Sequence, residues 1–170
     1  MALHWYALRS KPRKEDVLFR QLNAHEFKIF YPRVKVNPVN PRARKMRPYF
    51  PGYMFVYVDL EEVGVSTFEW MPFGLGLVSF GGEPAIVPPD VIPALSRHLS
   101  EINQQGGLRF GGLKPGTPVW ITEGPFAGYE AIFDARLPGS VRVKVLLQLL
   151  NDRRVPLELH VGQIEPKKQK

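Results

Sequence analysis

The sequence predicts an α+β protein with two domains: an antiparallel sheet with helices, followed by a small closed β-barrel. Three observations support this fold class. The first part of the chain alternates short apolar runs with segments of helical period. The last third contains only short apolar runs between turn residues. Seventeen prolines and fifteen glycines in 170 residues favour turns and short elements over a long helical bundle.

The first domain opens with a predicted strand and a predicted helix. Residues 5–8 form an apolar run that is typical of a strand. Ser10 and Pro12 suit the start of a helix, because serine is a good N-cap and proline fits a first turn. We expect this helix to reach about Glu26. Its buried stripe consists of Leu18, Phe19 and Leu22.

A second strand and a basic loop follow. Residues 28–36 contain enough apolar residues to predict a strand. Residues 37–48 are rich in proline and predict an exposed loop at the tip of a hairpin. The cations of this loop are Arg42, Arg44, Lys45 and Arg47.

The predicted strand at 49–59 has two apolar faces. Tyr53, Phe55 and Tyr57 point to one face, and Met54, Val56 and Val58 point to the other. An antiparallel sheet with helices on one side normally leaves its second face polar. Another helix or a partner protein must therefore cover the second face. An aromatic row suits a protein interface, although the period alone favours an intramolecular core equally.

Three further elements complete the first domain, which we expect to end at residue 103. They are a short helix at 61–71, a strand at 77–80 and a helix that begins at Pro88-Pro89-Asp90. The apolar stripe of the last helix consists of Val91, Leu95, Leu99 and Ile102. A glycine-rich linker then spans 104–112.

The segment 113–170 has a different pattern. Short strands are predicted at 119–121, 131–133, 141–145 and 155–157. Glycine, proline, asparagine and aspartate supply the turns between them. Because closure removes unpaired strand edges, this segment predicts a small closed barrel.

The net charge of +7 is unevenly distributed along the chain. Residues 1–50 hold 12 Lys and Arg against 3 Asp and Glu, a balance of +9. Residues 51–170 hold the other 11 Lys and Arg against 13 Asp and Glu, a balance of −2. Such a concentration favours a polyanionic partner, most often nucleic acid. The alternative is a solvated basic face without a partner.

The sequence lacks the residues and spacings of an enzyme. It has no cysteine, which excludes disulfides, thiolate nucleophiles and cysteine-ligated zinc. The four histidines have no metal-ligand spacing, and no glycine-rich phosphate loop joins a strand to a helix. We expect a non-enzymatic binding protein with no cofactor and no metal. Without a membrane-length apolar run or a signal-peptide pattern, we expect it in the cytoplasm.

Four motifs in order along the chain resemble the NusG family of transcription elongation factors. They are Trp5-Tyr6, Phe50-Pro51-Gly52-Tyr53, Phe80-Gly81-Gly82 and Gly124-Pro125-Phe126-Ala127-Gly128. This resemblance implies a NusG N-terminal (NGN) domain at 1–103 and a KOW-type barrel at 113–170. Motifs at 84–88, 121–124 and 146–151 are more similar to the specialised RfaH-type paralogues than to ordinary NusG proteins.

The resemblance implies that the N-terminal domain binds the clamp helices of the largest RNA polymerase subunit. Phe50, Tyr53 and Phe55 would carry that contact, and their alternative role is plain core. Ser66 and Thr67 would face the polymerase gate loop. RfaH-type proteins have a histidine before this position, where Val65 stands here.

Contact with the non-template DNA strand is implied for the basic first helix and the strand before it. The candidate residues are Arg9, Lys11, Arg13, Lys14 and Arg20. Single-stranded DNA is bound by such cationic surfaces through its phosphates. The loop cations at 42–47 would contact upstream DNA or polymerase, or remain solvated.

The barrel would recruit a small-subunit ribosomal protein or the termination factor Rho. Its candidate contacts are Phe126, Leu149 and Leu150. In RfaH-type proteins the C-terminal domain can instead be an α-hairpin that masks the polymerase site, held by an acidic residue paired with an arginine. Here Arg47 would face Arg142 and repel it, and several prolines interrupt the segment. We therefore expect a stable barrel with no helical state.

The leading hypothesis is a monomeric RNA polymerase-binding elongation and antitermination factor that bridges the polymerase clamp. The second is a ribosome- or RNA-associated structural protein, since KOW barrels also occur in ribosomal proteins. An rRNA-embedded barrel should be strongly basic. Residues 113–164 hold 6 Lys and Arg against 5 Asp and Glu, which favours the first hypothesis.

Overall fold

The computed structural model describes residues 2–37, 46–104, 108–109, 132–134 and 137–151. The chain divides into two compact units. The first unit consists of Met1–Pro32 and Phe50–Ser96, and the second of Arg33–Tyr49 and Arg97–Lys170.

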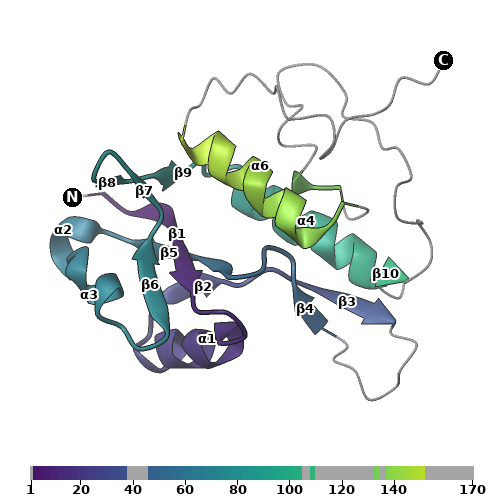
Figure 1. The fold of residues 1–170 in the computed structure, drawn as a ribbon, viewed down its shortest axis with the longest axis horizontal. Helices are drawn as coiled ribbons and strands as arrows, with labels where there is room; N and C mark the ends of the chain where they lie inside the picture. The colour runs from purple at the N-terminus through teal and green to yellow at the C-terminus, as the bar shows by residue number, and fades with distance from the viewer. Residues whose placement is uncertain (1, 38–45, 105–107, 110–131, 135–136, 152–170) are drawn as a thin grey trace. The chain divides into compact units, whose positions relative to one another are not determined.

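An antiparallel sheet forms the centre of the first unit (Figure 1). Its strands are β1 (His4–Ser10), β2 (Lys28–Phe30), β5 (Tyr53–Val58), β6 (Gly74–Leu77) and β9 (Ile86–Val87). They lie in the order β2-β5-β1-β6, with β9 also paired to β1. A separate two-stranded ladder joins β7 (Ser79–Phe80) to β8 (Glu83–Pro84). The sequence-predicted strands at 5–8 and 49–59 are thus confirmed as β1 and β5, with β5 shorter than predicted.

The helices of the first unit are short. They are α1 (Glu15–Ala24), α2 (Leu60–Val63), α3 (Ser66–Glu69) and the first part of α4 (Val91–Gln104), which continues into the second unit. The single helix predicted at 61–71 is divided, because Gly64 ends α2 with a φ of 91° that a helix cannot continue.

The predicted helix start at Ser10 and Pro12 is wrong by several residues. Ser10 belongs to β1, and its backbone N–H donates to the carbonyl of Gly52 at 2.8 Å. Arg13 then adopts a φ of 64°, so the helix begins only at Glu15. The side-chain hydroxyl of Ser10 donates to the carbonyl of Lys11 at 2.9 Å, and α1 begins after Lys14 without a side-chain cap, so the N-cap preference of serine did not decide the boundary.

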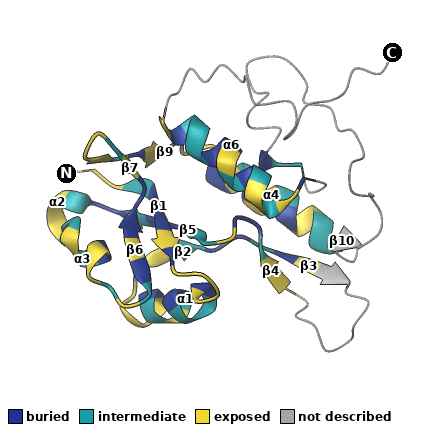
Figure 2. Ribbon diagram, in the orientation of Figure 1, coloured by how far each residue is buried: buried dark blue, intermediate teal, exposed yellow. Residues whose placement is uncertain are grey.

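One face of this sheet forms a continuous core with α1 and α3. Its buried residues include Tyr6, Leu8, Leu18, Leu22, Met54, Val56, Val58 and Phe68. The predicted stripe of α1 is confirmed at Leu18 and Leu22, while Phe19 is half-buried. In Figure 2 the inner strands are mostly dark blue, and α1 alternates between buried and exposed residues. The face that carries Met54 is therefore the structural core of the first unit.

The second unit contains a three-stranded sheet and two helical segments. Strand β3 (Arg33–Asn37) pairs antiparallel with β4 (Met46–Pro48) and parallel with β10 (Leu108–Arg109). The strand predicted at 28–36 is thus two strands, β2 and β3, in different sheets. The backbone N–H of Lys35 donates to the Asn103 side chain at 2.8 Å, which joins β3 to the end of α4.

The strand predicted at 141–145 is wrong, because these residues lie in helix α6 (Gly139–Asn151). Its buried residues are Arg142, Val145, Leu146 and Leu150, a spacing of three and four that forms one helical face. The expectation of a C-terminal part with no helical state is therefore wrong for this segment. Residues 132–134, part of another predicted strand, are not extended in a ladder either.

The rest of the predicted barrel lies outside the described residues, including the strands at 119–121 and 155–157. Most of the linker at 104–112 also lies outside them. The barrel and the domain boundaries at 103 and 113 therefore stay predictions.

Candidate functional site

The aromatic face of β5 is partly buried by the chain's own atoms. Phe55 stacks on Phe30 and meets Phe50 edge-on, each pair with ring centroids 6.0 Å apart. Phe50 and Phe55 are both fully buried, at 0% exposure, and Tyr53 is half-buried. At the two phenylalanines this conformation agrees with the alternative role of plain core, and their contact with polymerase stays a prediction. Tyr53 alone of the three predicted clamp contacts keeps accessible surface.

The accessible part of the same face continues along a row that the sequence prediction missed. Trp5 lies opposite Tyr57 in the β1–β5 ladder, with ring centroids 5.1 Å apart. The ammonium group of Lys28 lies 5.0 Å from the Tyr57 ring centroid and 5.9 Å from that of Trp5. Both rings are half-buried and Lys28 is exposed. Alternation along 53–57 places Tyr57 beside Phe55, but only the strand register brings Trp5 and Lys28 to it.

The turn before β5 is held in place by backbone hydrogen bonds. The N–H of Tyr53 donates to the carbonyl of Phe50 at 3.0 Å. Gly52 adopts a φ of 86°, which favours glycine at this position of the turn. Arg9 lies opposite Tyr53 in the β1–β5 ladder, so the first predicted DNA contact neighbours a predicted polymerase contact.

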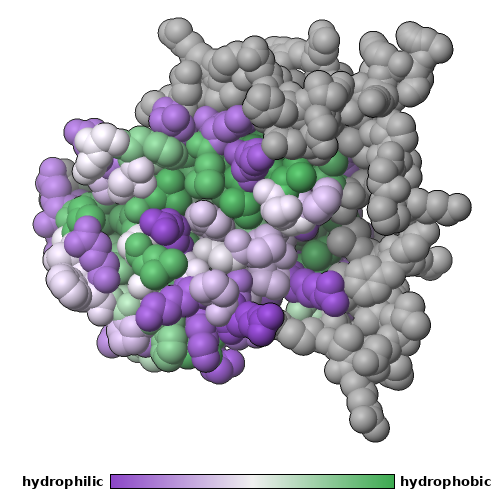
Figure 3. Space-filling model, in the orientation of Figure 1, coloured by the Kyte–Doolittle hydropathy of each residue, from purple (hydrophilic) through white to green (hydrophobic). Residues whose placement is uncertain are grey.

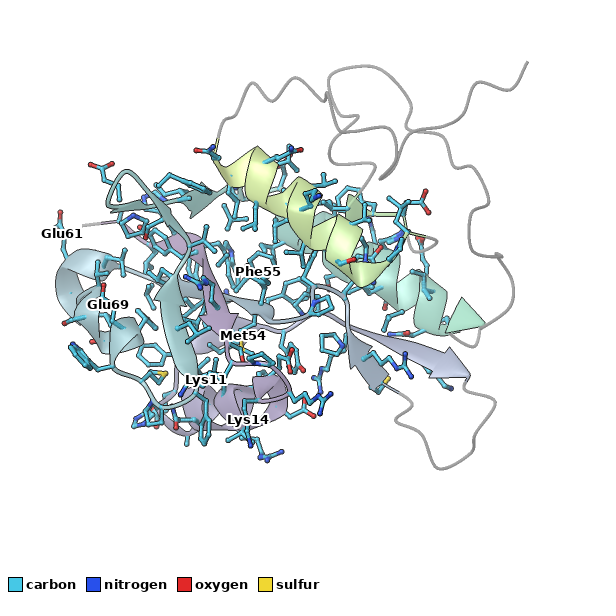
Figure 4. The ribbon with its side chains drawn as sticks, in the orientation of Figure 1. Lys11, Lys14, Met54, Phe55, Glu61 and Glu69 are labelled. Atoms are coloured by element: carbon cyan, nitrogen blue, oxygen red, sulfur yellow. The ribbon has the colours of Figure 1, made fainter. Side chains whose placement is uncertain are left out.

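The predicted DNA-binding cations are all exposed. They are Arg9, Lys11, Arg13, Lys14 and Arg20. Lys11 and Lys14 lie together beside α1 (Figure 4), and the ammonium group of Lys14 is 5.6 Å from the Phe73 ring centroid. In Figure 3 hydrophilic side chains gather over α1.

The two carboxylates at the start of α1 accept hydrogen bonds from other parts of the first unit. Glu15 is 6% exposed, and its Oε2 accepts the N–H of Gly52 at 2.8 Å. Asp16 accepts the hydroxyl of Tyr31 at 2.8 Å. The acidic groups of the first turn are therefore bound within the unit, and the positive charges at 11–14 face solvent.

The remaining predicted polymerase contacts lie on α3. Ser66 is exposed, and the hydroxyl of Thr67 donates to the carbonyl of Val63 at 2.8 Å. Thr67 also lines a cleft of about 440 Å³. The other residues of this cleft are Gln21, His25, Phe27, Met71 and Pro72. Beside it Trp70 is 82% exposed, an accessible ring that the sequence prediction did not single out.

In the second unit, Arg142 is 5% exposed and is bound by Tyr49. Its Nε donates to the Tyr49 carbonyl at 3.0 Å, and its guanidinium lies 4.0 Å from the Tyr49 ring centroid. It also donates to the carbonyl of Leu137. The expected repulsion by Arg47 is wrong, because the carbonyls and the ring take the place of an acidic partner. Arg47 is exposed in the β3–β4 ladder.

Burial changes the acidity of this pair. It lowers the pKa of Arg142, while the nearby Tyr49 and Asp134 act in the opposite direction. Burial also raises the pKa of Tyr49, against a smaller lowering effect of Arg142. The guanidinium and the neutral phenol are the forms present at neutral pH.

Of the three predicted ribosome or Rho contacts, the structure describes only the two leucines of α6. Phe126 lies outside the described residues, Leu149 is half-buried, and Leu150 is 3% exposed in α6. Of the two described leucines, only Leu149 keeps accessible surface in this conformation. Among the described residues, no three His, Cys, Asp or Glu side chains gather as a metal site would need. No helix in the described part of the chain is long and apolar enough to cross a membrane.

Comparison with known proteins identifies the family. A family profile described as "Transcription termination factor nusG" matches residues 3–96, more than half of the chain. The transcription termination/antitermination protein NusG of Deinococcus radiodurans is 26% identical over 96% of this chain and 99% of its own length. That of Thermus thermophilus is 24% identical over 96% and 98%. A solved structure described as "Domain interaction in Thermotoga maritima NusG" covers 73% of this chain and 68% of its own, at 21% identity and a TM-score of 0.38. The chain belongs to the NusG family of transcription termination and antitermination factors.

Proposed function

We propose that this chain is an RNA polymerase-binding elongation and antitermination factor that bridges the polymerase clamp and contacts the non-template DNA strand. The family assignment supports the general role. The observation that carries the finer proposal is the pairing of Arg9 with Tyr53 across β1 and β5. It makes a partly exposed aromatic face and a cationic turn neighbours on one unit. A protein that binds polymerase beside the displaced DNA strand needs both surfaces together.

The polymerase contact would be centred on Tyr53 and extend along Trp5 and Tyr57. Aromatic side chains with one accessible face are typical anchors of protein interfaces. Phe50 and Phe55 would join the contact only after they are uncovered, since both are fully buried. Ser66 and Thr67 would add a second contact on α3.

The DNA contact would use Arg9, Lys11, Arg13, Lys14 and Arg20. All five are exposed, and the carboxylates of Glu15 and Asp16 are bound elsewhere. Their charge is therefore available to phosphates. The proposed mechanism is steric and electrostatic: a factor that binds the closed clamp better than the open one shifts polymerase toward the closed, pause-resistant state.

Within the family, we propose a specialised RfaH-type paralogue, acting as a monomer that recruits ribosome or Rho through its C-terminal part. The helix at 139–151, where a barrel strand was expected, supports this assignment, because an α-helical C-terminal form is the feature that the RfaH resemblance implies. In vitro transcription on several templates tests it. A general NusG protein would affect all templates alike, and a specialised one would act only on those with its DNA element.

The polymerase contact is tested by Tyr53→Ala combined with Tyr57→Ala, two half-buried positions whose truncation leaves the core intact. We expect polymerase binding to fall at least about tenfold, since interface anchors cost ~2 kcal/mol or more. The matched control is Ile86→Ala, which truncates an exposed residue of the same sheet in the Tyr6 row. Unchanged binding would reject the site. Recovery of rRNA without polymerase in a pull-down would instead favour a ribosome-associated role.

A further inference from the structure

Glu15 is an acidic residue buried within the most basic turn of the first unit. Lys11, Arg13 and Lys14 precede it directly and are exposed, whereas Glu15 is 6% exposed. Its carboxylate accepts the N–H of Gly52 at 2.8 Å, a residue 37 positions away along the chain. Burial of a carboxylate is costly unless it is hydrogen-bonded. The hydrogen bond from Gly52 therefore offsets part of the cost of burying the Glu15 carboxylate.

Gly52 is bound on both sides. Its carbonyl accepts the N–H of Ser10 at 2.8 Å, while its own N–H donates to Glu15. Two further backbone hydrogen bonds hold the segment between Ser10 and Glu15. The Lys11 N–H donates to the Phe73 carbonyl, and the Lys14 N–H donates to the Lys11 carbonyl. The basic turn at 10–14 and the turn at 50–53 are thus joined through one glycine.

We infer that Glu15 is a positioning residue that fixes the proposed DNA-contacting turn to the proposed polymerase-contacting turn. The inference rests on the proposed function and adds how its two contacts are coupled. A fixed offset between the cations and Tyr53 means that docking on polymerase places the cations against DNA without a further ordering step. Such preorganisation raises affinity by lowering the entropy cost of the second contact.

The hydrogen bond itself is tested in the free, full-length protein by amide exchange at Gly52. Glu15→Ala removes the acceptor, and the Gly52 amide should exchange about tenfold faster or more, as expected for a lost bond to a charged group. Glu15→Gln retains an acceptor oxygen and should preserve most of the protection. Asp16→Ala is the matched control, since it removes the neighbouring carboxylate that binds Tyr31 instead. Unchanged Gly52 protection in Glu15→Ala would overturn the inference.

The coupling is tested by binding to an elongation complex with an exposed non-template strand. Lys11→Ala with Lys14→Ala (both labelled in Figure 4) should reduce the slope of log affinity against log salt by about 1.4, the value for two phosphate contacts to single-stranded DNA. In a Glu15→Ala background the same pair of substitutions should change the slope by less than half of that. In the Glu15→Gln and Asp16→Ala backgrounds, the two lysine substitutions should again reduce the slope by about 1.4. A purely structural role for Glu15 would lower the melting temperature but leave the slope change equal in all backgrounds.

The two proposals fail in different ways. If Tyr53→Ala with Tyr57→Ala leaves polymerase binding unchanged, the proposed interface is wrong, and the Gly52 exchange experiment still decides what Glu15 holds. If that variant loses binding while the salt-slope change is the same in the Glu15→Ala and original backgrounds, polymerase binding stands and the positioning role of Glu15 is wrong.

Discussion

At the scale of single residues, Arg142 is the charged group with the least exposure in the second unit's described part. Its guanidinium is satisfied by the carbonyls of Tyr49 and Leu137 and covers the Tyr49 ring. Removal of such a group leaves buried acceptors without a donor, which costs more than the contact itself contributes. We therefore expect helix α6 to depend on this side chain.

Arg142→Met tests that dependence. The substitution keeps an unbranched apolar side chain and removes the guanidinium with its charge and donors, so we expect a loss of about 1–3 kcal/mol and reduced helix at 139–151. NMR secondary shifts of α6 provide the measurement. Lys144→Met is the matched control, because Lys144 is an exposed cation of the same helix. Native helical shifts in Arg142→Met would contradict the prediction.

Tyr49 gives the second unit a dependence on alkaline pH. Burial raises the pKa of the Tyr49 phenol above its ordinary value of about 10. At a pH between the ordinary and the raised pKa, the unfolded chain has lost a phenol proton that the folded chain retains. Stability is fully present below about pH 10 and falls as the pH rises further. Tyr49→Phe keeps the ring and should lessen this alkaline loss. Equal unfolding midpoints against pH for both proteins would show that Tyr49 does not contribute.

At the scale of elements, boundaries follow the bonds made by the residues at each end. Asp59 is the N-cap of α2, and its carboxylate accepts the N–H of Glu61 at 3.0 Å. Helix α2 is only four residues long and ends at Gly64. An element this short cannot sustain itself through its own helical bonds, so its caps decide whether it forms.

Asp59→Ala should accordingly destabilise the first unit by about 0.5–2 kcal/mol, the usual effect of a lost N-cap. Denaturant unfolding measures this loss. Asp59→Asn is the control, since an asparagine oxygen accepts the same hydrogen bond, and it should recover most of the stability. If the alanine and asparagine variants unfold alike, the cap does not carry the effect.

At the scale of the whole molecule, the first unit combines a local cluster of cations with accessible aromatic side chains, although its net charge is −3, from 6 Lys and Arg against 9 Asp and Glu. The five predicted DNA contacts and the Trp5–Tyr57 row all belong to the first unit. The first unit's Lys and Arg all lie at 9–28, while its residues 50–96 contain six carboxylates and no Lys or Arg. Electrostatic attraction to DNA should therefore arise from one part of the surface, and apolar docking from the part beside it.

This segregation predicts different salt dependences for the two contacts. Binding to an elongation complex with exposed non-template DNA should weaken with salt, with a log–log slope of about −2 to −3.5 for three to five phosphate contacts. Binding to core polymerase without nucleic acid should depend on salt only weakly. Titrations at several salt concentrations measure both slopes. Equal slopes would mean that the cations contact polymerase and not DNA.

Much of the first unit could be predicted from the sequence, because the spacing of apolar residues along each segment indicates whether it forms a strand or a helix. Alternation in 53–58 identified β5 and its two apolar faces, and the stripe at Leu18 and Leu22 identified α1. The exposed cations were also predictable, since charged residues in a turn remain in water. The row formed by Trp5, Tyr57 and Lys28 was not, because strand register brings it together.

The sequence by itself determined the family motifs, the position of the charge and the apolar periods. Only the tertiary structure decided that Phe50 and Phe55 are buried and that 139–151 is a helix. That segment alternates valines at period two and also places Arg142, Val145 and Leu146 on one helical face, so local pattern allows both structures. In the helical form Arg142 binds Tyr49, which is 93 residues away, and a local sequence pattern cannot reveal a contact over that distance in the chain.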